Sequence, residues 1–271
     1  MLQAFRYAAP QTRSELLSLL AREGSSAKLL AGGTDLLVNI RNGLSRPSLV
    51  INVKRVEGFG GLSWDEREGL VIRPATTIND LLRDERVRER FPLLVAGAQD
   101  LASYQIRNRA TVIGNVVNAS PCSDMAPQLL CLNARAVISS ESSEREVSFR
   151  EFFTGVKKTV LKPDELLERI IVPAEMAGAQ GAYLKLKRIN GHDLGIVGVA
   201  LMRKDGLMRL GISSAAPTPV LVGDFSAAEE PDTVVRAALD AINPISDVRC
   251  TKEYRSYMVE VFVRRLLAEV P

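Results

Sequence analysis

Hydrophobic and polar residues alternate between helical and strand-like spacing from the start of the chain. Thr12 and Glu15 form a capping-box pattern before four leucines between positions 16 and 20, which predicts a helix ending at about Gly24. Residues 28–30 then read as a short strand that runs into the sequence AGGTD. A short helix stopping near Gly43 follows, and the β-branched run SLVINV at 48–53 predicts a buried strand.

A second block follows the glycine-rich stretch GFGG at residues 58–61. The pattern predicts a helix opened by Thr77, a longer helix from about 92 to 104, and a helix around 125–132. Strands are expected near 70–73, 136–139, 146–149 and 170–172, with a short helix capped by Ser148 and Glu151. The stretch ATVIGNVVNASPCSD, at 110–124, is interpreted as a loop.

The last third of the chain has a simpler pattern. AEMAGAQGA at 174–182 reads as a linker, and strands are predicted at 183–188, 196–203 and 208–213. Helices at about 231–242 and 251–268 complete an antiparallel sheet with helices on one face. We therefore expect an α+β protein with one domain at 1–176, made of subdomains at about 1–56 and 57–176, and a second domain at 177–271.

The charge and hydropathy of the chain exclude several function classes. The net charge is +3, and positively and negatively charged residues are both scattered along the chain. This distribution gives no reason to expect a nucleic acid as partner. No apolar run approaches the roughly 20 residues that span a bilayer, and we expect no membrane span. The start of the chain has no continuous apolar stretch of the kind found in signal peptides, so a cytoplasmic location is expected.

Cysteine and histidine are too few for the commonest metal centres. The three cysteines, Cys122, Cys131 and Cys250, form no CxxC pair, and an iron–sulfur cluster needs a fuller set of thiolates. His192 is the only histidine, which argues against a histidine-rich metal site. We read it as an exposed turn residue.

Two loops carry candidate chemistry. The first loop, Ala31 to Asp35, joins a strand to a helix through two consecutive glycines, which lets the backbone approach an anion closely. Such turns also exist only to reverse the chain, and this one matches neither GxGxxG nor GxxxxGK[ST]. The second loop, Thr111 to Asp124, mixes small, hydrogen-bonding and apolar residues, as expected around a buried polar ligand. Taken alone, the position of Asp124 favours an ordinary helix N-cap over a ligand contact.

Together the two loops closely resemble the paired FAD loops in the FAD-binding (medium) subunit of the molybdenum hydroxylases, the xanthine, carbon monoxide and aldehyde dehydrogenase family. The resemblance extends to EFFTGVKKTVLKPDELLERIIVP at 151–173, YLKLKRINGHDLGIVGVAL at 183–201 and DVRCTKEYRSYMVEVFVRRLL at 247–267. It therefore covers essentially the whole chain in order. It implies a two-subdomain FAD-binding domain of the PCMH-like type, followed by a C-terminal flavoprotein domain.

The resemblance also implies which residues contact a non-covalently bound FAD. The first loop and its flanks would wrap the phosphates and ribityl chain together with the start of the second loop, Asp124 would hydrogen-bond the cofactor, and a lysine would lie near the ring. The implied contacts are Leu30, Ala31, Gly32, Gly33, Thr34, Asp35, Leu36, Leu101, Thr111, Val112, Ile113, Gly114, Asn115, Asp124, Leu167 and Lys185. Ile113 stands where the family has glycine, so a glycine-only backbone conformation there would change the loop.

The resemblance implies an oxidoreductase subunit that is not active alone on the organic substrate. Electrons would arrive from the [2Fe-2S] clusters of a small partner subunit, and FAD would pass them to an external acceptor such as NAD or a quinone. The molybdenum cofactor would lie in a large molybdopterin-binding subunit, completing a heterotrimer. Two alternatives stay open: a stand-alone FAD-dependent oxidoreductase, and a non-catalytic nucleotide-binding scaffold with the same fold.

Overall fold

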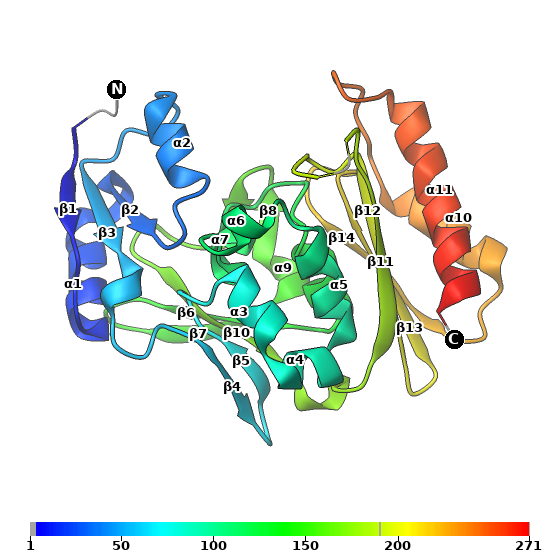
Figure 1. Cartoon of the computed structure of the whole chain (residues 1–271), viewed down its shortest axis with the longest axis horizontal. Helices are drawn as coiled ribbons and strands as arrows, with labels where there is room; N and C mark the ends of the chain where they lie inside the picture. The colour runs from blue at the N-terminus through cyan, green and yellow to red at the C-terminus, as the bar shows by residue number, and fades with distance from the viewer. Residues whose placement is uncertain (1–3, 190, 271) are drawn as a thin grey trace.

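The computed structural model describes residues 4–189 and 191–270. Over these residues the strands form a three-stranded, a five-stranded and a four-stranded sheet and a separate two-stranded hairpin. Figure 1 shows the three larger sheets following one another from the N-terminal to the C-terminal side of the molecule. The proposed domain boundaries after residues 56 and 176 fall between them and stay predictions.

The first sheet is parallel, with strand order β1-β3-β2. It contains β1 (Arg6–Ala8), β2 (Ala27–Leu30) and β3 (Leu49–Asn52), with α1 (Arg13–Glu23) and α2 (Leu36–Arg41) in the connections. The predicted capping box of α1 is confirmed, since Thr12 accepts from the Glu15 N–H and the Glu15 carboxylate accepts from the Thr12 N–H. The first loop lies at the carboxyl end of β2, the edge where parallel sheets bind ligands.

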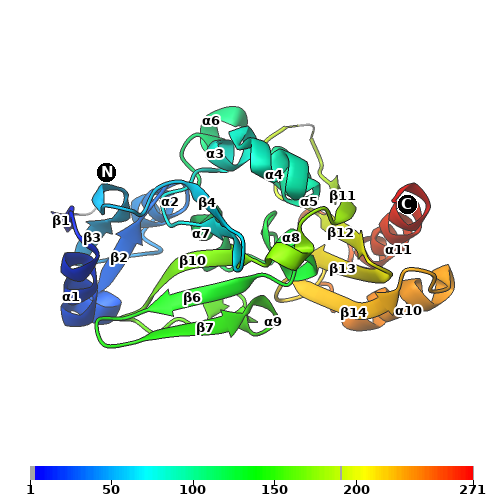
Figure 2. The same cartoon turned by 90° about the horizontal axis from the view of Figure 1, so that it is seen from below.

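The second sheet is antiparallel, with order β4-β5-β10-β6-β7. Figure 2 shows helices α3 to α6 on one side of it. Its strands are β4 (Leu62–Asp65), β5 (Gly69–Ile72), β6 (Arg135–Ser139), β7 (Glu144–Ser148) and β10 (Leu166–Val172). The helices of this unit are α3 (Ile78–Arg83), α4 (Glu85–Arg90), α5 (Pro92–Asp100), α6 (Tyr104–Arg107), α7 (Val112–Val117), α8 (Ala126–Cys131) and α9 (Phe149–Phe152), and the hairpin pairs β8 (Phe153–Gly155) with β9 (Lys158–Thr159).

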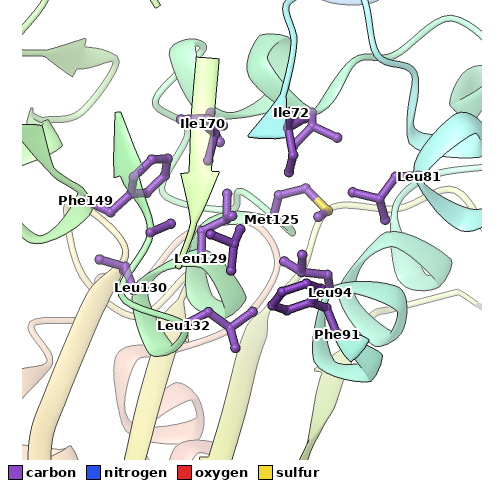
Figure 3. Packing of buried hydrophobic residues seen from close by; sticks show 14 of the residues in the cluster. Ile72, Leu81, Phe91, Leu94, Met125, Leu129, Leu130, Leu132, Phe149 and Ile170 are labelled. Carbon is purple, nitrogen blue, oxygen red and sulfur yellow. The ribbon is translucent and has the colours of Figure 1, made fainter. Parts of the chain in front are cut away.

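The third sheet is an antiparallel meander of β11 (Gln180–Leu186), β12 (Val197–Lys204), β13 (Leu207–Ser213) and β14 (Val220–Ser226). Helices α10 (Pro231–Ala241) and α11 (Lys252–Glu269) cover its outer face, as predicted (Figure 1). Its inner face packs on α5 and α8 of the middle unit. One apolar cluster runs through this contact, because it includes the residues labelled in Figure 3 together with Ala200 and Met202 of β12.

Several predicted elements differ from the structure. The helix expected at 92–104 ends at Asp100, because Ala102 has a φ of +47° that an α-helix cannot contain, and Ser103 caps the separate α6. The stretch 110–124 contains α7, although its sequence VIGNVV has low helix propensity. The expected linker at 174–182 holds a short 3-10 turn and the start of β11, and β14 was not predicted.

Candidate functional site

The first loop has backbone N–H groups that are free to bind an anion. Gly33 has a φ of +76°, a left-handed conformation that glycine adopts without strain. Among the described residues, the backbone N–H groups of residues 32 to 35 donate no hydrogen bond, and Asp35 makes no side-chain cap on α2. Four consecutive donors without a protein acceptor fit phosphate oxygens.

The second loop begins as a capped helix. The Thr111 hydroxyl accepts from the Gly114 N–H at 3.0 Å, and the Thr111 backbone pairs with Thr77 in an isolated bridge. Ile113 lies inside α7, is not among the residues with positive φ, and is only 6% exposed in the main core. The position therefore requires no glycine, and isoleucine there stabilises the loop by packing.

The first loop lies against the residues that directly precede the second loop. A Cβ at Gly32 would collide with the backbone carbonyl of Arg109, just before the second loop, so only glycine allows this approach. Lys54, after β3, donates to the Ala31 carbonyl at 2.6 Å, and the pKa of its ammonium is lowered by burial and by the nearby Arg109 charge. The region around both loops therefore carries two cations that a bound anion would neutralise.

Asn115 fixes the far end of the second loop. Its Oδ1 accepts from the Ser123 hydroxyl at 2.6 Å and from the Met125 N–H at 3.3 Å. These bonds fold the loop back on α7 and hold Asp124 at the entrance to α8. The predicted role of Asp124 as an ordinary N-cap is not observed, since Met125 takes the cap position and the Ser123 hydroxyl, not Asp124, accepts from the Ala126 N–H at the start of α8.

Asp124 instead joins a buried charge cluster with β11. The Lys185 Nζ lies 2.7 Å from the Asp124 Oδ1, and their side chains are 2% and 11% exposed. The Tyr183 hydroxyl donates to the same oxygen at 3.3 Å. Burial raises the pKa of Asp124, and the Lys185 charge opposes that rise, while burial followed by the Asp124 charge raises the pKa of Tyr183 well above its ordinary value.

A second ion pair flanks the first one. Lys187 Nζ lies 2.8 Å from Asp100 Oδ1, at the end of α5, and Lys185 also donates to the Asp100 carbonyl at 3.2 Å. Lys185 in β11 and Lys187 directly after it therefore link the middle unit to the C-terminal sheet. Sequence reasoning missed Asp100, Tyr183 and Lys187; the only signal was the alternation of Tyr183, Lys185 and Lys187 along one face of a predicted strand.

The remaining residues singled out in the sequence differ in their exposure to solvent. Leu101 and Leu167 are 5% and 2% exposed and belong to the main apolar core, so in this structure they line no open surface. His192 is exposed in the β11–β12 turn, as predicted. In and directly beside the first loop, the predicted contacts are half-buried or exposed, namely Leu30, Ala31, Thr34, Asp35 and Leu36.

The segment after α10 supports the site from the C-terminal side. Arg249 donates to the Gly195 carbonyl at 3.1 Å and contacts the Cys122 Sγ at 3.3 Å, while Asp247 Oδ2 lies 2.6 Å from its guanidinium. Asp247 Oδ1 lies 3.3 Å from the guanidinium of Arg255, which is only 1% exposed. The hydrogen bond from Arg249 lowers the pKa of Asp247 to about 2.

Asp247→Asn is expected to lower the free energy of unfolding by about 1–3 kcal/mol at neutral pH, because buried Arg255 loses its carboxylate partner. Since the folded-state pKa of Asp247 is depressed, its contribution is present above the ordinary aspartate pKa of about 3.9 and is lost as the pH falls toward 2. Urea unfolding at several pH values measures both effects. Exposed Asp205→Asn is the matched control; an equal loss of stability in both variants would contradict the assignment.

The first loop offers backbone donors without a protein acceptor among the described residues, and the second loop ends at the buried Asp124–Lys185 pair. The chain belongs to the family described as the FAD binding domain in molybdopterin dehydrogenase, which matches residues 3–175. Its cofactor is therefore FAD, and the relatives in the family are dehydrogenase subunits.

Individual relatives match over nearly the full chain. The carbon monoxide dehydrogenase medium chain of Hydrogenophaga pseudoflava is 33% identical over 276 residues, covering 97% of this chain and 96% of its own. The xanthine dehydrogenase FAD-binding subunit of Escherichia coli O157:H7 is 29% identical over 272 residues, covering 95% and 93%. A long and broadly shared likeness of this kind supports the same fold throughout.

Solved structures of such proteins have the same fold as this chain over nearly its full length. A chain of the Hydrogenophaga pseudoflava carbon monoxide dehydrogenase that lacks the Mo-pyranopterin moiety of the molybdenum cofactor superposes with a TM-score of 0.91 at 30% identity, covering 99% of this chain and 97% of that one. A chain of the cyanide-inactivated Cu,Mo-CO dehydrogenase gives 0.92 at 28% identity, covering 99% and 98%. Within the described residues, no helix is long and apolar enough to cross a membrane.

Proposed function

We propose that this chain is the FAD-carrying electron-transfer subunit of a cytoplasmic molybdenum hydroxylase complex. Bound FAD would take electrons from the [2Fe-2S] clusters of a small partner subunit and release them to an external acceptor such as NAD or a quinone. The observation that carries the proposal is the close approach of Gly32 to the Arg109 carbonyl, directly before the second loop, next to four backbone donors of the first loop that have no protein acceptor among the described residues.

Each predicted contact would have a distinct role. The N–H groups of residues 32 to 35 would bind the phosphates, with Lys54 and Arg109 supplying positive charge nearby. Asp124 uses its Oδ1 for Lys185 and Tyr183, so its second oxygen would accept from a cofactor hydroxyl. Lys185 would place its positive charge near the ring and favour the reduced, more negative state of the cofactor.

Partners follow from the relatives' names. A protein called a medium chain or medium subunit belongs with a larger and a smaller one, and several relatives carry that name. We therefore propose a heterotrimer with a molybdopterin-binding large subunit and a [2Fe-2S] small subunit.

The test is the absorption spectrum of the purified chain after incubation with FAD and desalting. We expect equimolar flavin with the visible bands of the oxidised form, and loss of those bands when the reduced cluster subunit is added. Flavin retained but never reduced by that subunit would favour the scaffold alternative. Turnover of an organic substrate by the chain alone would favour the stand-alone oxidoreductase.

A further inference from the structure

Ser214, the residue directly after β13, combines two unusual features. Its φ of +66° lies in the left-handed region that side chains rarely adopt. Its residue exposure is 8%, and its Oγ is buried without a hydrogen-bond partner among the described residues. A buried hydroxyl that has lost water and gained no partner costs free energy, so such a group usually has a partner in the working molecule.

The backbone around Ser214 is held rigidly. Its N–H donates to the carbonyl of Pro121, in the second loop, at 2.7 Å. Its own carbonyl accepts from the guanidinium of buried Arg255 at 2.8 Å. The chain is therefore fixed on both sides of the strained residue, and the hydroxyl direction is determined by the fold.

The Ser214 hydroxyl lies close to the Lys185 side chain. A Cβ built on Gly195 would lie 3.2 Å from the Ser214 Oγ and 3.3 Å from the Lys185 Cε. Both side chains therefore lie next to the backbone of Gly195, on the side where a larger residue would have its Cβ. Lys185 and the second loop are both parts of the proposed FAD site. Ser214 is thus an unpartnered polar group placed where that site meets the C-terminal unit.

We propose that Ser214 is a further cofactor-binding residue, whose hydroxyl hydrogen-bonds a polar atom of bound FAD on the side of Lys185. This inference rests on the proposed function of the chain. The strained backbone and the unpaired hydroxyl are both unfavourable in the cofactor-free chain, and cofactor binding supplies the missing partner.

The test uses Ser214→Ala and Ser214→Gly in the full chain, with FAD affinity and the melting temperature of the cofactor-free protein measured in parallel. Loss of one hydrogen bond should weaken FAD binding about tenfold in both variants. The melting temperature of the cofactor-free chain should stay the same or rise, most in Ser214→Gly, because glycine also removes the backbone strain.

Asp205→Gly is the matched control, since Asp205 has a φ of +48° in the exposed β12–β13 turn. It should raise the melting temperature and leave FAD affinity unchanged. Unchanged FAD affinity in both Ser214 variants would overturn this inference and leave the proposed function of the chain standing. Parallel losses of melting temperature and affinity would assign the hydroxyl a structural role and overturn it too. A wild-type chain that binds no FAD would overturn the proposed function together with the inference.

Discussion

Gly33→Val is expected to abolish measurable FAD binding while the cofactor-free chain stays folded. At a φ of +76° a β-branched side chain is strained, so the loop backbone is expected to change its conformation, and the Leu30 Cδ1, 2.8 Å from the new Cβ, must also shift. Displacement of the free N–H donors should lower FAD affinity at least about 100-fold, which corresponds to about 2.7 kcal/mol. Flavin content after desalting and circular dichroism melting measure the two effects.

Gly60→Val is the control for this substitution. Gly60 also lies in a loop, but its φ is not positive and no heavy atom lies within 4 Å of a Cβ built there. We expect it to retain full flavin. Full flavin content in Gly33→Val, or an equal loss in Gly60→Val, would place the phosphate-binding loop elsewhere.

The parts of the site that the sequence predicts are local ones. The strand, the glycine pair and the helix around Gly33 follow one another within a few residues, and the Thr12 capping box and the helix start at Thr77 are predicted from neighbouring residues. Such elements depend mainly on backbone propensity and nearby hydrogen bonds. The structure therefore has them where the pattern predicts them.

The remaining parts depend on contacts between distant segments. Tyr183 and Asp124 meet although they lie 59 positions apart, because α5 and α8 pack against the inner face of the C-terminal sheet. Helix α7 forms despite its β-branched residues, since Thr111 caps it and the core buries Ile113. Tertiary packing overrides local propensity at these positions, and periodicity alone carries no information on it.

Lys185→Met is expected to lower the reduction potential of bound flavin by about 30–60 mV, or about 1.4–2.8 kcal/mol for a two-electron couple. The substitution removes a buried positive charge and leaves Asp124 as an unpaired negative one, at the place where the ring is proposed to bind. Without Lys185, burial raises the pKa of Asp124 further. The shift should therefore shrink as the pH falls and Asp124 takes up a proton, and grow as the pH rises. Potentiometric titration at several pH values measures it.

Asp124→Asn separates this charge effect from a loss of structure. It leaves the Lys185 ammonium without its carboxylate, so the potential should rise, while the Tyr183 hydroxyl keeps an amide oxygen as acceptor. The double variant should return close to the wild-type potential, because the two buried charges are removed together and their contributions cancel. If the single substitutions acted by damaging the structure, their effects on the potential would instead add up in the double variant. An unchanged potential in both single variants would mean that this ion pair only joins the two units and does not act on the flavin.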